Sequence, residues 1–326
     1  MKNLRKFAAI ALGALALTTF NSCDDSDSNG ETRNIAEIAS ATPDLSILVQ
    51  ALTRAGLVDN VSGNTNLTVF APTNEAFLDF LEANNFETLE DVPVPLLQKV
   101  LLNHVVAGSL RSSDLQTGYV KTLSTGAAST TSNISMFINT NGGVVLNGGV
   151  PNGGATVTTP NIAARNGVIH IVNSVISVPD VVDLVLANPN YSSLRDALTR
   201  NDQPDFVSLL RTQVGTEPAP VTVFAPDNDA FAALLGELNA PNLAAIDGAT
   251  LTAVLYYHVV AGANVLSGSL QNNQPVTTAG DGIFTIQLPA TGAQITDGDN
   301  RVTKIVATDI QGDNGVIHEI DRVLLP

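Results

Sequence analysis

The sequence predicts an α+β protein built from two tandem copies of one domain. The segment TVFAPTNEAF at Thr68–Phe77 returns as TVFAPDNDAF at Thr222–Phe231, with eight of ten positions identical and a spacing of 154 residues. This spacing is too long for solenoid repeats, whose periods run at roughly 20–50 residues, and it indicates a duplicated domain. Within each copy, helical periodicity comes first and β-rich runs follow, which is typical of an α+β fold.

Two shorter blocks support the duplication. HVVAG at His104–Gly108 recurs at His258–Gly262, and NGVIH at Asn166–His170 recurs at Asn314–His318. The spacing changes between blocks, from 154 to 148 residues, so insertions and deletions fall between them. Because surface loops absorb length changes at low cost, we expect the shared blocks to be packed elements.

The chain begins with a predicted signal peptide, residues 1–22. Basic residues near the start precede the mostly apolar run Phe7–Phe20, which is short for a membrane span and suits a signal core. Cys23 is the one cysteine and follows directly, as in a bacterial lipoprotein, where the thiol receives lipid. An ordinary signal peptide that contains a cysteine is the alternative. With one cysteine, no disulfide can form within the chain.

Residues 23–33 are predicted to be an acidic, disordered tether, since they offer nothing to bury. Acidic residues directly after a lipidated cysteine resemble signals that send some Gram-negative lipoproteins to the outer surface, although a solvated linker would look the same. The expected location is therefore the bacterial cell envelope, as a surface-exposed outer-membrane lipoprotein anchored to the membrane through Cys23.

The first domain is assigned to residues 34–178 and opens with two short helices separated at Pro43. The apolar run Leu67–Phe70 predicts a buried strand, which the following Ala-Pro ends. Thr73 is placed to cap the next helix, as Asp227 is in the second copy. This strand, turn and helix form a packing unit.

The β part of the first domain runs from Asn133 to Val178, with three Asn-Gly-Gly segments that signal hairpin turns in an antiparallel sheet. The second domain is assigned to residues 179–326, and its β part is shorter. Hardly any linker separates the domains near Ser177–Asp180, so we expect them to touch or to be held in a restricted orientation.

All four histidines lie in the repeated blocks. His104 and His258 each end an apolar helix face, whereas His170 and His318 alternate in phase with inward-facing strand residues. A buried neutral histidine needs partners for its ring nitrogens, which backbone groups can supply. We therefore expect structural histidines. A zinc site would need further ligands and no cysteine is available in the domains, so neither a metal nor a cofactor is expected.

Taken together, the three ordered blocks in both halves resemble the fasciclin domain. The resemblance covers residues from about Asn34 to Pro326 and implies a compact, β-sandwich-like wedge with packed helices. The second copy keeps the family's usual Tyr before the mid-domain histidine, as Tyr257-His258, whereas the first has Asn103-His104. The resemblance also implies adhesion to proteins or carbohydrates of cell surfaces and matrix.

Composition and motifs narrow the function further. The net charge of −16 argues against electrostatic binding of nucleic-acid phosphates. The sequence lacks a nucleophile elbow, a P-loop and a zinc-protease motif. The acidic turns near Asp297 and Asp309 do not complete an EF-hand and are predicted to be solvated. We therefore expect no enzyme activity.

The sequence thus favours an envelope-anchored adhesion or binding module that recognises an extracellular protein or carbohydrate. An accessory ligand-binding or enzymatic component of a glycan-uptake system is the alternative. The predicted contact surface is the mid-domain block, where a helix ends and a loop begins. Tyr257 would serve there as a part-exposed anchor, unless it is buried beside the histidine. The remaining candidates on this surface are Gly262, Ala263, Asn264, Asn103, Gly108, Ser109 and Leu110.

Overall fold

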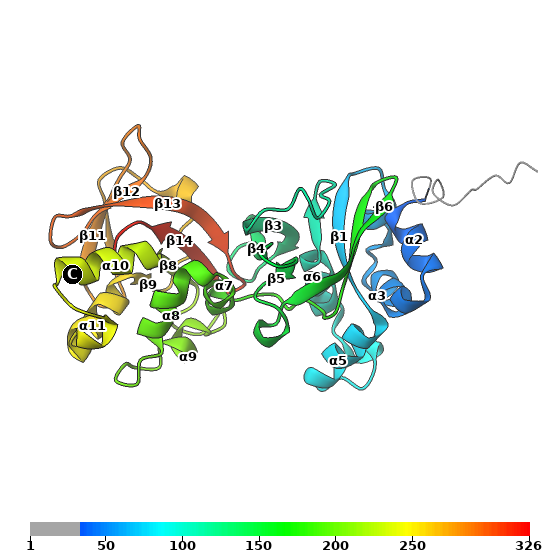
Figure 1. Ribbon diagram of the computed structural model, residues 1–326, viewed down its shortest axis with the longest axis horizontal. Coiled ribbons are helices and arrows are strands. Elements are labelled where there is room, and N and C mark those ends of the chain that lie inside the picture. Colours follow the sequence, from blue (N-terminus) through cyan, green and yellow to red (C-terminus); the bar gives the residue numbers. More distant parts are fainter. Residues whose placement is uncertain (1–32) are drawn as a thin grey trace, which may run out of the picture.

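Two α+β units lie side by side along the long axis of the computed structural model (Figure 1). The structure describes residues 33–326. The predicted signal peptide, Cys23 and all of the tether except its last residue lie outside the described residues.

The helices of the first unit lie in its N-terminal part. They are α2 Ile35–Ala41, α3 Ser46–Ala55, α4 Val58–Ser62, α5 Asn74–Ala83 and α6 Val94–Asn103, with 3₁₀ turns at Pro43–Leu45 and Leu89–Asp91. The predicted break at Pro43 is confirmed. Among residues 33–326 no single helix could cross a membrane by length and hydropathy, and one pair passes that test jointly, Ile35–Ala41 with Pro43–Ala55, bent by 111°.

Seven strands close into a barrel in the first unit. They are β1 Leu67–Pro72, β2 Val105–Ala107, β3 Gly118–Thr125, β4 Asn133–Asn139, β5 Val145–Leu146, β6 Ala155–Ala164 and β7 Gly167–Val172. Of the three predicted hairpin signals, the first lies in the β4–β5 turn, while the second and third share the β5–β6 loop, which contains a 3₁₀ turn at Val150–Asn152.

The second unit repeats the order of elements. Its helices are α7 Val181–Ala187, α8 Ser192–Leu198, α9 Phe206–Leu210, α10 Asn228–Glu237 and α11 Gly248–Tyr257, with 3₁₀ turns at Pro189–Tyr191, Leu243–Ala245 and Ser267–Ser269. Its strands are β8 Val221–Pro226, β9 Val259–Val260, β10 Gln274–Thr277, β11 Ile283–Gln287, β12 Gln294–Thr296, β13 Val302–Gln311 and β14 Gly315–Ile320. They form one seven-stranded sheet in the order β10-β11-β12-β13-β14-β8-β9. The predicted α+β class and the two tandem domains are confirmed.

The expectation of a purely antiparallel sheet is wrong at one pairing in each unit. Strand β1 pairs with β7 in parallel, as β8 does with β14, while the other ladders are antiparallel. A parallel pair needs a long crossover, and nearly the whole domain lies between these two strands. The repeated TVFAP and NGVIH blocks are therefore neighbours in space, although they stand far apart in the sequence.

The helix that follows each parallel strand is capped as predicted. Thr73 accepts a hydrogen bond from the Ala76 N–H at 3.2 Å, and Asp227 accepts one from the Ala230 N–H at 2.7 Å. Each side chain satisfies one of the free N–H groups of its helix.

The repeated Asn of NGVIH ties the first helix of each domain to its closing strand. Asn166 Oδ1 accepts the Ile35 N–H at 2.9 Å, and Asn314 Oδ1 accepts the Val181 N–H at 3.1 Å. The Nδ2 atom of Asn166 also donates to the carbonyl oxygens of Val61 and Gly63, both at 2.9 Å. Each of these buried amides therefore holds together segments that are distant in the chain.

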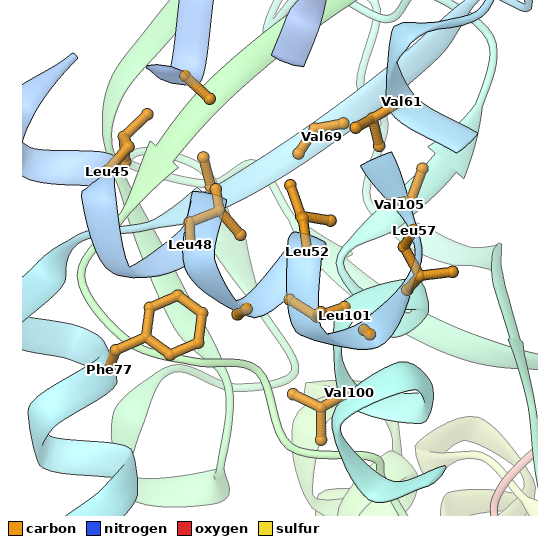
Figure 2. Packing of buried hydrophobic residues seen from close by; sticks show 14 of the residues in the cluster. Leu45, Leu48, Leu52, Leu57, Val61, Val69, Phe77, Val100, Leu101 and Val105 are labelled. Atoms are coloured by element: carbon orange, nitrogen blue, oxygen red, sulfur yellow. The ribbon is translucent and has the colours of Figure 1, made fainter. Parts of the chain in front are cut away.

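Helix α3 supplies the centre of the first apolar core. Figure 2 shows its Leu48 and Leu52 packed among Phe77 of α5, Leu101 of α6 and Val69 of β1. A separate apolar cluster is formed mostly by residues of the barrel strands, and the second unit has two corresponding clusters. Burial of these side chains is the main source of stability, because apolar burial contributes about 25 cal/mol for each Å².

Candidate functional site

His104 and His258 lie at the ends of α6 and α11, where their rings join the helix to the end of the domain. His104 Nδ1 donates to the Val100 carbonyl at 2.8 Å, and its Nε2 accepts the Ile176 N–H at 2.8 Å. His258 bonds in the same way to Val254, at 2.7 Å, and to Leu324, at 2.9 Å. Both nitrogens of each ring are therefore occupied by backbone groups.

His170 and His318 hold the loops that follow the mid-domain block. The Nε2 of His170 donates to the Leu110 carbonyl at 2.9 Å, and the Nε2 of His318 donates to the Val265 carbonyl at 2.8 Å. The rings stack on Phe70 and Phe224, with centroids 5.5 and 5.4 Å apart. The Nδ1 of His170 accepts the Asn161 N–H, whereas the Nδ1 of His318 is buried without a partner.

Burial keeps these rings neutral. It lowers the pKa of His104 and of His258 to about 4, and it lowers the pKa of His170 and His318 as well. Among residues 33–326, no group of three or more His, Cys, Asp or Glu side chains is placed to hold a metal ion. We propose that the four histidines have a structural role, as the sequence led us to expect.

Of the two alternatives for Tyr257, the structure has the buried one, so Tyr257 is not a part-exposed anchor. The residue is 1% exposed, and its hydroxyl donates to the Ile283 carbonyl of β11 at 2.7 Å. The ring lies over Gly282, where a Cβ atom would come within 2.6 Å of Tyr257 Cδ2. A partner could not reach this side chain without opening the domain.

Asn103 is also unavailable to a partner, because it is 0% exposed and its Nδ2 donates to the Ser177 carbonyl at 3.0 Å. Of the neighbouring candidates, Gly262 and Ser109 are exposed, and the others are partly buried: Gly108, Leu110, Ala263 and Asn264. The hydroxyls of Thr68 and Thr222 accept from the N–H groups of Leu110 and Val265, which fastens both loops. The loops thus present small, firmly held surfaces without an aromatic anchor.

In the acidic turn that was predicted to be solvated, Gly298, Asp299 and Asn300 are exposed, but the prediction is wrong for Asp297. Its side chain is 0% exposed and pairs with the Arg301 guanidinium at 2.8 Å. Asp297 also accepts the N–H groups of Arg301 and Leu325, at 2.9 and 3.1 Å. The carboxylate therefore anchors the end of the chain.

The two domains meet in a bonded junction, as the short linker led us to expect. Tyr119 of β3 donates its hydroxyl to the Leu184 carbonyl of α7 at 2.7 Å. The Gln311 N–H of β13 donates to Ser135 Oγ of β4 at 3.0 Å. Lys121 Nζ donates to both Ser135 Oγ and the Asp309 carbonyl. These bonds join the sheet of one domain to the other.

Asp313 adds a second set of contacts across the junction. Its carboxylate lies 2.9 Å from Lys99 Nζ and accepts the Ala127 N–H at 2.9 Å. Its carbonyl accepts the Ala128 N–H at 2.8 Å. Gly126 packs so closely that a Cβ atom there would lie 2.9 Å from Asp313 Cα. The two domains are therefore closely fitted here.

A cleft of about 430 Å³ opens beside this junction, and it is lined by both domains. Tyr119 and Asn139 come from the first domain, and Asn190, Thr308 and Glu319 come from the second. We call this feature the junction cleft. Its volume lies within the range of roughly 300–1,000 Å³ that is usual for ligand sites, which often occur between domains.

Sequence reasoning missed the junction cleft, although one signal marks it. Glu319 accepts the hydroxyl hydrogen of Tyr191 at 2.7 Å through Oε2. In the aligned blocks of the first copy, the corresponding positions are the apolar Ile171 and Leu45. A comparison of the two copies could have indicated the cleft, because a polar pair in one copy stands where the other has an apolar pair.

The fold and these sites define a class of protein: tandem α+β domains whose repeated histidines bond within the fold and whose junction forms a cleft. The profile of the fasciclin domain matches residues 43–179 and 189–326, so the chain belongs to the fasciclin family. The resemblance seen in the sequence is therefore confirmed.

Several named proteins are similar to the chain. Human periostin is 29% identical over 281 residues, which is 83% of this chain and 29% of periostin. Protein sll1735 of Synechocystis sp. is 39% identical over 143 residues, which is 44% of this chain and 96% of that protein. A solved FAS1 domain pair from the insect cell adhesion molecule fasciclin I matches with a TM-score of 0.54 at 18% identity, covering 87% of this chain and 97% of that one. The chain spans less than a third of periostin and 11% of mouse stabilin-2.

Proposed function

We propose that the chain is an envelope-anchored adhesion module that recognises a cell-surface or matrix protein or carbohydrate. The observation that supports this proposal most is the junction between the domains. Hydrogen bonds join the two fasciclin domains there, and a cleft large enough for a ligand opens beside them. The fold is shared with a domain pair from an insect cell adhesion molecule. Binding is favoured over catalysis because the histidines of the repeated blocks bond to backbone groups inside the fold.

We assign the anchor to Cys23 and the location to the outer membrane of a bacterial envelope. Cys23 directly follows the apolar run of the predicted signal peptide, and acidic residues follow it. Metabolic lipid labelling of the full chain and of Cys23→Ala tests the anchor. We expect label on the wild type alone, and label retained on the variant would contradict the assignment.

Adhesion is tested with cells that produce the full chain or its Cys23→Ala variant. Cells with the anchored chain should bind to surfaces coated with collagen, fibronectin or neutral polysaccharide, and an excess of the released chain should compete. Cells with the variant should bind less, because lipid would no longer anchor the protein at the cell surface. If cells with the anchored chain and cells without the chain bind equally to every coating, the proposed function is wrong.

A further inference from the structure

We propose that the junction cleft is a binding site for a neutral oligosaccharide. This inference rests on the proposed binding function and names the chemical class of the ligand. It follows from the side chains that line the cleft, from the charge of its walls, and from a difference between the two copies of the domain.

The walls of the cleft are held in place by contacts that cross the junction. Tyr119 bonds to the Leu184 carbonyl and meets Phe137 edge to face, with ring centroids 5.0 Å apart. In the second domain, Glu319 is fixed by its bond from Tyr191. A site with walls fixed in advance loses little conformational freedom when it binds a ligand.

The polar groups in the cleft retain free hydrogen-bonding capacity. In the part of the chain that the structure describes, no hydrogen bond involves the Asn190 side chain or the Oε1 atom of Glu319. Asn139 Oδ1 accepts the Asn141 N–H at 2.9 Å, which leaves its Nδ2 hydrogens free. Amide and carboxylate groups match the hydroxyls of a sugar, each of which both donates and accepts. The aromatic pair adds apolar area for the C–H groups of a sugar ring.

The charge of the cleft favours a neutral ligand. Neither lysine nor arginine lines it, and Glu319 is its one ionisable carboxylate. The whole chain carries −16, so a phosphate, a sulfate or a uronic acid would be repelled. A cation would find a single carboxylate that already accepts the Tyr191 hydroxyl, among neutral amides and hydroxyls.

The duplication shows that the fold does not require the polar pair of Tyr191 and Glu319. The first copy has Leu45 and Ile171 at the positions of Tyr191 and Glu319, and it forms the same 3₁₀ turn and the same parallel strand pair. Placing a tyrosine hydroxyl and a carboxylate in a largely buried position costs free energy that an apolar pair avoids. Since Glu319 of this pair lines the cleft and Tyr191 holds its carboxylate, we infer that the pair serves the ligand.

The direct test is calorimetric titration of the full chain, held in detergent micelles, with short neutral gluco-, manno-, galacto-, xylo- and chito-oligosaccharides. We expect saturable binding of at least one series and none of oligogalacturonate. Asn190→Ala and Glu319→Gln should each raise the Kd about tenfold, which corresponds to about 1.4 kcal/mol. Gln213→Ala is the matched control, because this exposed amide lies outside the cleft, and it should leave the Kd unchanged.

A double variant separates binding from folding. Tyr191→Leu with Glu319→Ile installs the pair of the first copy, so we expect the domain to keep a cooperative melting transition and to lose oligosaccharide binding. The proposal is overturned if no neutral oligosaccharide binds to the wild type. It is also overturned if the cleft variants bind the oligosaccharide with the Kd of the wild type. Binding of spermine that Glu319→Gln abolishes, without any oligosaccharide binding, would instead make the cleft a cation site.

The two proposals can fail separately. Cells that adhere to protein coatings through a chain that binds no oligosaccharide would leave the adhesive function intact and remove the carbohydrate assignment. Oligosaccharide binding by a chain that does not promote adhesion would support the carbohydrate site and contradict the adhesive function.

Discussion

At the residue scale, each buried histidine acts as a cross-link between backbone segments. We expect His258→Ala to lower the free energy of unfolding of the second domain by about 1–3 kcal/mol, because the Val254 carbonyl and the Leu324 N–H lose their partner. Chemical denaturation measures this change. Stoichiometric zinc in the purified wild type, lost in the variant, would contradict the structural role.

The same histidines predict a dependence of stability on pH. His104 and His258 have a pKa of about 4 in the fold and an ordinary value of 6.5, so between these pH values the unfolded chain binds protons that the folded chain does not. Stability should therefore fall as the pH drops through this window, by at most about 1.4 kcal/mol per pH unit for each histidine. Urea denaturation at pH 7, 6 and 5 tests this, and His258→Asn should show a smaller slope in the second domain.

Tyr257 illustrates what local sequence cannot reveal. Its burial depends on Gly282 and Ile283, at the start of β11, which the fold brings against the ring. We expect Tyr257→Phe to cost about 1 kcal/mol for the lost hydrogen bond, and Tyr257→Ala about 3–5 kcal/mol for the cavity. Thermal melting distinguishes them. Adhesion per folded molecule should match that of the wild type, and a loss of adhesion at unchanged melting temperature would restore Tyr257 as a contact.

At the scale of elements, the parallel strand pair depends on a glycine. Gly315 begins β14, and a Cβ atom there would collide with the Val221 carbonyl of β8. Gly315→Ala should therefore disrupt the pairing and cost more than about 3 kcal/mol, as judged by thermal melting.

Gly236 of α10 is the matched control, since a Cβ atom at this position meets nothing within 4 Å. Gly236→Ala should raise stability by up to about 1 kcal/mol, because alanine favours a helix over the unfolded chain. If both variants behave alike, close approach of the backbone at Gly315 is not the reason for its glycine.

Many elements could be predicted because their signals are local. The break at Pro43 and the caps at Thr73 and Asp227 depend on residues only a few positions apart. The parallel pairing could not be predicted, because it joins strands separated by most of a domain. Asp297 was misjudged for a similar reason, since one of its partners is the N–H of Leu325, 28 residues away.

At the scale of the whole molecule, the duplication made the domain organisation predictable. The junction between the domains could not be predicted. Its cleft needs groups from both copies, such as Asn139 and Asn190, and neither copy alone indicates where the other will lie. Closure of the first sheet into a barrel likewise depends on long-range pairing, of which Val106 with Thr122 is one contact.

We predict that residues 34–178 and 180–326 each fold alone, and that the full chain melts at a higher temperature than either fragment. The added stability comes from junction bonds such as Tyr119 to Leu184 and Gln311 to Ser135. Differential scanning calorimetry of the three proteins tests both points. If neither fragment shows a cooperative transition, the chain is a single folding unit.

If the chain is anchored through Cys23, as proposed, the amide of Asn166 has a mechanical consequence. Tension that enters at Asn34 meets the bond from the Ile35 N–H to Asn166 Oδ1, directly before β7. Strand β7 lies parallel to β1, so a pull along their axis would shear the ladder and load its hydrogen bonds together. With a ligand held in the junction cleft, the load would cross the first domain and the junction before it reached the second-domain residues that line the cleft.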